Sequence, residues 1–296
     1  MKYIANNDFD FSNTCVTFGY FDGIHVGHSA VISKLWETSK VGMTSVLISF
    51  DLDESLLGEK KLLSTEEEKR HLLEKNGPDI MISYKVRTEN VVTEAFIKDV
   101  LIEKLGTKVV VAGTSYEFIG LLRSCATKFG FKIVECADVL YDRKLITSER
   151  ILKELVNGTI AEANKLLGHA YLIMGKVVHG RELGRTVGMP TVNLGLNKFK
   201  QLPAFGVFGT ISEIDEEKVK GLTSIGYRPS VDSDYYITIE TYLLNFSGDL
   251  YDKTIALEIH IYIREIMKFN NIEEVKAQVN KDVELIRADL DMIGYI

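Results

Sequence analysis

Two patterns of hydrophobic and polar residues divide the chain into halves. In the first half, short β-rich runs alternate with stretches in which apolar residues recur every three or four positions. Strands that alternate with helices are typical of βαβ units, in which a parallel sheet carries binding sites at the carboxyl ends of its strands. The first half is therefore expected to be a Rossmann-like α/β domain. The strands are expected at 14–19, 45–50, 80–83, 108–113 and 132–135, and the helices from residue 28 onward and near 65–76, 93–105 and 118–130.

In the second half the helical pattern disappears after residue 170 and returns only at the end. Runs joined by turns without intervening helices predict an antiparallel closed sheet, a small β-barrel. The terminal segment has helical spacing, with Asn271 as a candidate N-cap and Glu274 placed for a capping box. Its apolar stripe, expected to pack on the barrel, is Ile272, Val275, Val279, Val283, Ile286 and Leu290. The strands are expected at 170–178, 206–213, 218–224, 235–246 and 254–263, with a hairpin turn at 247–249.

The join between the halves is short and ordered. Helical runs at 149–155 and 160–167 are separated by the turn Asn157-Gly158-Thr159, and no low-complexity linker or internal repeat is visible. The expected division is a first domain over 1–157, a connecting helix over 158–169 and a second domain over 170–296.

Composition narrows the class of protein. The chain has 296 residues, 46% of them hydrophobic and 26% charged, which is ordinary for a soluble globular protein with two cores. A net charge of −7 argues against a general nucleic-acid partner, which requires a basic face. The N-terminus lacks the apolar core of a signal peptide, and no run has membrane-spanning length. Cys15, Cys125 and Cys136 show no metal-type spacing, so we expect reduced thiols in a cytoplasmic protein.

A run rich in glycine and arginine leads into a candidate strand at Thr191. Repeated glycine beside arginine suits a loop whose amides and guanidinium groups meet phosphate. Pro190 fixes one backbone angle, and Thr191 and Asn193 then point to the same side of the strand, where their oxygens can ligate Mg²⁺. On spacing alone, a glycine-rich turn before an ordinary strand is an equal alternative. The candidate nucleotide-binding positions are Gly175, Gly180, Arg181, Gly184, Arg185, Gly188 and Pro190.

This run carries a resemblance. Residues 184–193, Gly-Arg-Thr-Val-Gly-Met-Pro-Thr-Val-Asn, resemble the signature of the riboflavin kinase domain, with Val192 as a mild variation. Residues 224–230 and 263–269 are similar to further motifs of that domain, with Ser224 and Ser230 as conservative changes. Nearly end to end, the chain resembles the bacterial bifunctional riboflavin kinase/FMN adenylyltransferases, or FAD synthetases.

The kinase resemblance implies roles for several residues. Thr191 and Asn193 would hold Mg²⁺ and the phosphates of ATP, with the 175–188 loop over the nucleotide. Glu240 would accept the proton of the ribityl 5′-hydroxyl as the phosphoryl group transfers. Without that context, Glu240 would be interpreted as a solvent-facing strand carboxylate. Arg264 and Glu265 would lie on the flavin side, and a surface ion pair between them is an equal alternative.

Residues 18–28, Phe-Gly-Tyr-Phe-Asp-Gly-Ile-His-Val-Gly-His, resemble the HxGH signature of nucleotidyltransferases. The family transfers AMP from ATP to the phosphate of FMN, a nucleophile that needs charge stabilisation and positioning rather than a base. His25 and His28, at a helix N-terminus, would donate hydrogen bonds to phosphates. Either histidine alone would more often be structural, and a zinc site lacks further ligands. The resemblance implies nucleotide binding by Gly19, Phe21, Asp22, Gly23, Gly27, Ser148 and Arg150.

Three departures from the family lie in the first half. Leu52-Asp53-Glu54 replaces a Pro-His-Pro sequence and adds negative charge, Ser115 stands where the family carries an acid, and Leu152 stands where it carries an arginine. Each change weakens contacts to phosphate or flavin. The resulting hypothesis is that the ATP turn is retained while the FMN-binding half is eroded, so that adenylyl transfer is slow or lost.

The expected function is flavin cofactor biosynthesis, from riboflavin to FMN in the second domain and from FMN to FAD in the first. A kinase with a degenerate first domain is the alternative, and a non-catalytic flavin- or nucleotide-binding protein is a third class. The expected partners are riboflavin, FMN and ATP with Mg²⁺, without nucleic acid or membrane. Self-association is left open.

Overall fold

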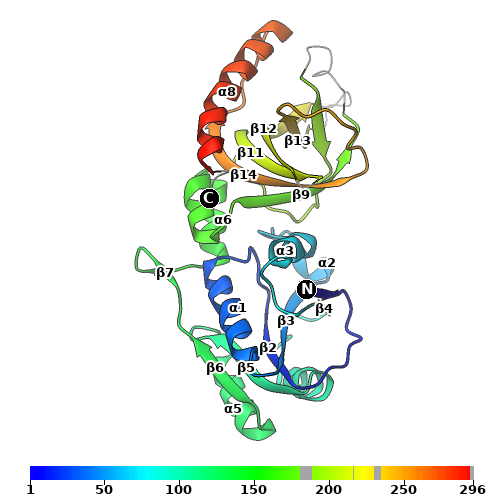
Figure 1. The fold of residues 1–296 in the computed structure, drawn as a ribbon, viewed down its shortest axis with the longest axis vertical. Helices are drawn as coiled ribbons and strands as arrows, with labels where there is room; N and C mark the ends of the chain where they lie inside the picture. The colour runs from blue at the N-terminus through cyan, green and yellow to red at the C-terminus, as the bar shows by residue number, and fades with distance from the viewer. Residues whose placement is uncertain (181–188, 216, 230–234, 294–296) are drawn as a thin grey trace. The chain divides into compact units, whose positions relative to one another are not determined.

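The computed structural model describes residues 1–180, 189–215, 217–229 and 235–293 (Figure 1). Its contacts divide the chain into two compact units, Met1–Arg150 and Ile151–Ile296. This division falls inside helix α6 (Ser148–Val156), a few residues before the boundary expected from the turn at Gly158. Within the described residues, no helix combines the length and apolarity that crossing a membrane requires.

The first unit contains a six-stranded sheet in the order β1-β4-β3-β2-β5-β6, and every pairing is parallel. The chain runs outward from β2 in two directions, first through β3 and β4 and then through β5 and β6. This reversal creates a crevice at the carboxyl ends of β2 and β5, where ligands bind in such sheets. The Rossmann-like fold is confirmed. The strands are β1 (Lys2–Ile4), β2 (Thr14–Gly19), β3 (Thr44–Leu52), β4 (Ile80–Val86), β5 (Thr107–Gly113) and β6 (Lys132–Cys136).

Helices cover both faces of this sheet. Successive residues of a strand point to opposite faces, so Ile48 packs in one cluster with helix residue Leu101, while its neighbour Leu47 packs in another with Ile32. Burial raises the pKa of the Cys15 thiol, on β2, to about 11. The helices are α1 (Val26–Ser39), α2 (Glu54–Leu57), α3 (Glu66–Leu73), α4 (Glu94–Phe96), the π-helix η1 (Ile97–Lys104) and α5 (Ile119–Phe129), and a small hairpin pairs β7 (Leu140–Tyr141) with β8 (Lys144–Leu145).

The second unit is a closed barrel in the order β10-β13-β12-β11-β14-β9, with every neighbouring pair antiparallel. A chain of hydroxyl groups crosses its interior, because Thr223 lies 2.9 Å from Thr210 and 2.9 Å from Thr241, and all three are fully buried. The barrel prediction is confirmed, but the hairpin expected around 247–249 is wrong, because β13 pairs with β10 and β12 while β14 pairs with β11 and β9. The elements are α6, α7 (Ile160–Leu167), β9 (Tyr171–Val178), β10 (Thr191–Leu194), β11 (Gly206–Ile214), β12 (Glu217–Pro229), β13 (Tyr235–Leu243), β14 (Thr254–Arg264) and α8 (Ile272–Ile293).

Helix α8 covers part of the outer face of the barrel. Val283, Ile286 and Leu290 of its apolar stripe pack against barrel residues such as Val207 and Leu222, as the sequence predicts. The N-cap also follows the prediction, since Asn271 Oδ1 accepts from the backbone N–H of Glu274 at 2.9 Å. The return bond differs, because the Glu274 carboxylate accepts from the N–H of Asn270, one residue earlier, at 3.0 Å.

Candidate active sites

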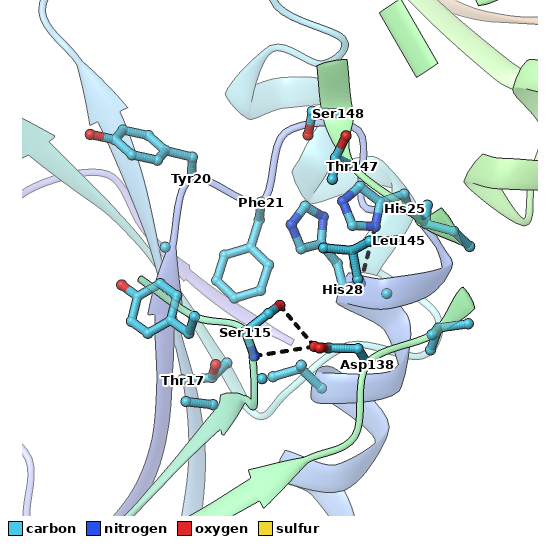
Figure 2. A pocket seen from close by; sticks show the side chains of 18 of the residues that line it. Thr17, Tyr20, Phe21, His25, His28, Ser115, Asp138, Leu145, Thr147 and Ser148 are labelled. Carbon is cyan, nitrogen blue, oxygen red and sulfur yellow. Dashed lines mark hydrogen bonds between the residues drawn. The ribbon is translucent and has the colours of Figure 1, made fainter. Parts of the chain in front are cut away.

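A cavity of about 410 Å³ lies at the carboxyl ends of β2 and β5 in the first unit (Figure 2). Seven of the residues that the sequence singled out line it, whereas Gly23 and Arg150 are not among the lining residues. The crevice of the sheet, the turn after β2 and the start of α1 therefore meet around one space. The seven are Gly19, Phe21, Asp22, His25, Gly27, His28 and Ser148.

The two histidines form a stacked pair at the N-terminus of α1. Their ring centroids are 3.6 Å apart, and His25 Nδ1 accepts from the backbone N–H of His28 at 3.3 Å. The His28 side chain is partly exposed, but its Nδ1 atom is buried and has no hydrogen-bond partner among the described residues. Burial, with added repulsion from His25 and Lys69, lowers the pKa of His28 well below its ordinary value. The ring is therefore neutral near neutral pH, with a nitrogen left for a ligand.

Gly27 leaves the His25 ring uncrowded. A Cβ at this position would lie 3.1 Å from Cε1 and 3.2 Å from Nδ1 of His25, so a side chain there would press on the ring. The glycine was expected to admit phosphate, and the structure adds that it admits the His25 ring.

Asp22 acts mainly as a scaffold for the turn after β2. Its carboxylate accepts from the backbone N–H groups of Leu63 at 3.1 Å and Ser64 at 2.9 Å, and its carbonyl oxygen accepts from Ser148 Oγ at 2.9 Å. The N–H of Gly23 donates to Ser64 Oγ at 2.7 Å, which fixes the glycine in the same network. These bonds connect three separate stretches of chain around the cavity.

A buried lysine, which the sequence analysis missed, strengthens this scaffold. Lys69 is 4% exposed, and its Nζ donates to the carbonyl of Tyr20 at 2.6 Å, to Glu66 at 2.6 Å and to Ser49 Oγ at 3.1 Å. Helix α3 is thereby tied to the turn that carries the histidines. Its position within a highly charged helical run, Glu66 to Arg70, gave no signal of burial.

The added acids after β3 do not line the cavity. Asp53 caps α2 and accepts from the backbone N–H of Ser55 at 3.0 Å and from its hydroxyl at 2.7 Å, bonds that lower the pKa of the Asp53 carboxyl. Glu54 is exposed and is likewise absent from the lining. The expected repulsion of ATP by these two carboxylates therefore has no basis in the geometry of the cavity wall.

Arg150 holds the β7–β8 hairpin rather than facing the cavity. Its guanidinium donates to the carbonyls of Tyr141 at 3.0 Å and Lys144 at 3.3 Å and lies over the Tyr141 ring. It therefore does not replace, within this cavity, the arginine that is missing at Leu152. Ser115 is a lining residue and is hydrogen-bonded to Asp138, another lining residue that the sequence analysis missed.

The second unit has a cavity of about 320 Å³ between the outer face of the barrel and α8. Thr191, Ser224, Glu240 and Arg264 line it, with apolar side chains that include Val279 of α8. Tyr242 also lines it and was missed, although it lies two residues after Glu240 and so on the same face of β13. A largely apolar chamber with a few polar groups is typical of a site for a flat organic ligand.

The barrel register brings the predicted kinase residues together. Asn193 on β10 lies directly opposite Glu240 on β13, and Thr191 lies opposite Tyr242. Glu240 in turn lies opposite Ser224 on β12. Because strand residues two apart share a face, Thr191, Asn193, Ser224 and Glu240 lie on one side of three neighbouring strands. Glu240 is half-buried and lines the cavity.

Gly180 leaves room for Asn193. A Cβ on Gly180 would lie 2.2 Å from Asn193 Nδ2 and 2.8 Å from Cγ, so no other residue fits there with Asn193 in this position. Gly175 instead lies within β9, where a Cβ would lie 2.3 Å from the carbonyl oxygen of Gly195. Pro190 is exposed beside Thr191. Arg181, Gly184, Arg185 and Gly188 lie outside the described residues.

The alternative of a surface ion pair between Arg264 and Glu265 is wrong in its partner. Arg264 pairs with Asp282 of α8 at 2.8 Å, and this carboxylate is fully buried and also accepts from Gln278 at 2.8 Å. Glu265 contributes only its backbone carbonyl, at 2.9 Å from Arg264 Nη1, and its exposed side chain does not line the cavity. The pairing residue lies 18 positions away, beyond the reach of a local sequence pattern.

In comparisons with known proteins, different family models match the two units of the chain. The family model described as FAD synthetase matches residues 8–150, and the one described as riboflavin kinase matches residues 167–290. A bifunctional riboflavin kinase/FMN adenylyltransferase from Buchnera aphidicola is 33% identical over 95% of this chain and 96% of its own length. One from Listeria monocytogenes is 30% identical over 96% and 95%. A crystal structure from Streptococcus pneumoniae, described as a macrolide-efflux protein, is 26% identical with a TM-score of 0.83, covering 97% of this chain and 99% of that one.

Proposed function

The chain belongs to the family of bifunctional riboflavin kinase/FMN adenylyltransferases, and we propose that each activity resides in one unit: phosphorylation of riboflavin at the Glu240 cavity and adenylylation of FMN at the His25–His28 cavity. ATP is the co-substrate of this enzyme family. The observation that carries the residue assignment is the register that sets Asn193 opposite Glu240 with Thr191 on the same face.

In the second unit, Glu240 accepts the proton of the ribityl 5′-hydroxyl as that oxygen attacks the γ-phosphorus of ATP. The new P–O bond forms as the bond to the β–γ bridging oxygen breaks, and ADP leaves. The apolar walls of the cavity hold the isoalloxazine ring, and Arg264, fixed by Asp282, borders it.

Thr191 and Asn193 would hold the Mg²⁺ ion. A hydroxyl and an amide oxygen are the hard donors that this ion prefers, and Gly180 lets the Asn193 side chain lie close against the neighbouring backbone. When bound, the ion would neutralise charge on the β- and γ-phosphates. Glu240, one strand away, keeps the proton-accepting role.

In the first unit, a phosphate oxygen of FMN attacks the α-phosphorus of ATP, and pyrophosphate leaves. Both partners are anions, so the protein must stabilise charge and align the groups rather than remove a proton. His28 offers a neutral ring with a buried, unpartnered nitrogen, and His25 holds that ring by stacking. Phosphates placed beside His28 would raise its pKa and favour the charged donor.

The kinase-only alternative is not favoured. The FAD synthetase model matches nearly the whole first unit, and the bifunctional relatives align over more than nine-tenths of the chain. Asp53 and Glu54 lie outside the cavity lining, which removes part of the reasoning for an eroded site. A purely non-catalytic binder would not need a carboxylate opposite the Asn193 position.

The cytoplasm is the proposed location, in keeping with Cys15, Cys125 and Cys136 as free thiols. Self-association stays an open alternative, which sedimentation of the purified chain tests.

The direct test of the proposed function is incubation of the purified chain with riboflavin and Mg-ATP, followed by chromatographic separation of the flavins. We expect FMN to form first and FAD to accumulate after it. Accumulation of FMN without FAD would contradict the role of the first unit, and unchanged riboflavin would contradict both roles.

A further inference from the structure

A carboxylate occupies the region of the first cavity from which the family's acid is missing. Ser115 follows β5 and Asp138 follows β6, two neighbouring parallel strands whose register sets Gly113 opposite Cys136. The carboxyl ends of these strands meet at one edge, so the two side chains come together although 23 positions separate them. Ser115 Oγ donates to Asp138 Oδ1 at 2.8 Å, and the backbone N–H of Ser115 donates to the same oxygen at 3.3 Å (Figure 2).

These bonds fix one oxygen of Asp138 and leave the other for a ligand. In the part of the chain that the structure describes, Asp138 Oδ2 has no protein hydrogen-bond partner, and Asp138 is a lining residue of the 410 Å³ cavity. A deprotonated carboxylate is an acceptor only, so the group it meets must be a donor. The hydrogen bonds from Ser115 hold the carboxylate in one orientation, which suits recognition rather than general charge.

The position of Asp138 in the cavity indicates which part of the substrate donates a hydrogen bond to it. The phosphates of ATP belong at the histidines, and a carboxylate beside them would be repulsive, so Asp138 must meet an uncharged part of the substrate. Figure 2 shows Ser115 and Asp138 on one side of the histidine pair and Thr147 and Ser148 on the other. Around Asp138 the wall is aliphatic, with Ala137 and Val139 as chain neighbours, and suits the flat base of a nucleoside.

An aromatic ring for the flavin lies on the other side of β2. Tyr20 is 42% exposed and lines the cavity, and its ring packs on the buried Phe50 of β3 with centroids 5.5 Å apart. Aromatic rings are the natural partners of an isoalloxazine ring. The nucleoside of ATP therefore falls to the β5–β6 side, where its ribose hydroxyls can donate to a carboxylate, as in other nucleotide sites of doubly wound sheets.

We propose that Asp138, after the neighbouring strand β6, binds the ribose hydroxyls of ATP in the first unit. This inference rests on the proposed adenylyltransferase function. In this arrangement Ser115 is the donor that orients the Asp138 carboxylate.

Asp138→Asn tests the contact in the full-length protein. The asparagine oxygen keeps the bonds from Ser115 while an NH₂ group replaces the free acceptor, so shape is preserved. Because the variant loses a charged hydrogen bond at an exposed wall, kcat/KM for ATP in FAD formation from FMN should fall about ten-fold. One of the two analogues 2′-deoxy-ATP and 3′-deoxy-ATP lacks the contacted hydroxyl. With that analogue, the kcat/KM values of the variant and the wild type should agree within about three-fold.

Asp142→Asn is the matched control, because it removes the same charge from the neighbouring hairpin at a residue that does not line the cavity. It should leave both rates unchanged. The swap Ser115→Asp with Asp138→Ser returns the acid to position 115 and should recover most of the activity that Asp138→Ser alone loses. Riboflavin phosphorylation by the second unit reports in every variant that the chain is intact.

The outcomes separate the inference from the function on which it rests. Equal loss in Asp138→Asn with ATP and with both deoxy analogues, or no loss at all, overturns the ribose contact while FAD formation by the wild type stands. If the effect of Asp138→Asn instead disappears with a flavin that lacks ribityl hydroxyls, Asp138 contacts FMN, and the ribose contact is overturned as well. Absence of FAD from the wild-type reaction would overturn the proposed function and this inference together.

Discussion

At the residue scale, the proposed kinase site depends on the register of the barrel strands. The alternating pattern of β13 does not distinguish Glu240 from other polar strand residues. Its proposed role follows from Asn193, which lies directly opposite it in the β10–β13 pair. A shift of either strand by one residue would turn the two side chains to opposite faces. The proposed kinase site is therefore specified by strand pairing as much as by residue type.

Gly180→Ala should damage the kinase without unfolding the chain. The new methyl group would lie 2.2 Å from Asn193 Nδ2, so the Asn193 side chain must rotate away from its position. Because Asn193 is a proposed metal ligand, this displacement should lower the rate of FMN formation about a hundred-fold. FAD formation from supplied FMN, measured in the same preparation, should be unchanged.

Gly120→Ala is the matched control for that variant. Gly120 lies in α5 of the first unit, and a Cβ there meets nothing within 4 Å. It should leave FMN formation at the wild-type rate. Wild-type FMN formation in Gly180→Ala would show that Asn193 is not needed where the structure places it.

His28 makes the stability of the first unit depend on pH. Because burial lowers its pKa, the folded chain resists protonation of this ring, whereas the unfolded chain takes up a proton below about pH 6.5. The unfolded state then binds more protons, so stability falls as the pH drops from about 7 to about 5. In His28→Gln this fall should be smaller, as measured by thermal melting across that range.

His71→Gln, which removes a histidine of the same unit that does not line the cavity, serves as the comparison for the loss of a histidine as such. An unchanged slope in His28→Gln would contradict the assignment of the buried neutral ring.

At the scale of elements, α8 forms one wall of the proposed flavin cavity. Val275 and Val279 line the cavity, while Val283 and Ile286, further along the same stripe, pack on the barrel. The Arg264–Asp282 pair fixes the helix between these two regions. The position of α8 therefore couples packing of the barrel surface to the shape of the site.

Asp282→Asn should loosen that attachment. The Asp282 side chain is fully buried and that of Arg264 is 18% exposed, so removal of one partner leaves a poorly solvated charge and costs about 2 kcal/mol in the free energy of unfolding. KM for riboflavin should rise because the α8 wall moves. Urea unfolding and riboflavin saturation curves measure the two effects.

Glu284→Gln serves as the control, since Glu284 is exposed on the same helix. It should change neither quantity. An unaltered riboflavin KM in a clearly destabilised Asp282→Asn would limit the ion pair to a structural role.

Periodicity predicted most elements, because burial against a sheet or a barrel imposes regular spacing. The run 14–19 and the helix 160–167 occur as predicted, and α8 begins at its expected cap. Short elements were missed: β1 and the β7–β8 hairpin are too brief for a period to register. The helix expected over 93–105 contains a π-helical stretch over Ile97–Lys104, which shares its apolar spacing with an α-helix.

The candidate sites were predicted where a motif is continuous in sequence. The turn around His25 lines the first cavity, and Thr191 lines the second, whereas Asn193, two residues further along the same strand, is not among the lining residues. Contacts between distant stretches were not predictable: Asp282 reaches Arg264 from α8, Asp138 reaches Ser115 from the next strand, and Lys69 reaches Tyr20 from α3. Each depends on strand order or helix packing, which one sequence does not reveal.

At the scale of the whole molecule, two units each have a core and a cavity of their own. FMN is the product of one proposed site and the substrate of the other, so a variant in one unit should affect one conversion only. This separation is what makes the account testable within a single chain.

Glu240→Gln provides the most direct test, because it removes a proton acceptor while keeping shape and metal ligands. The variant should lose FMN formation from riboflavin by orders of magnitude, bind nucleotide as before, and still convert supplied FMN to FAD at the wild-type rate. The exposed Glu217→Gln on β12 should leave both conversions intact. Near-normal phosphorylation of riboflavin by Glu240→Gln would remove Glu240 from the mechanism and contradict the central claim.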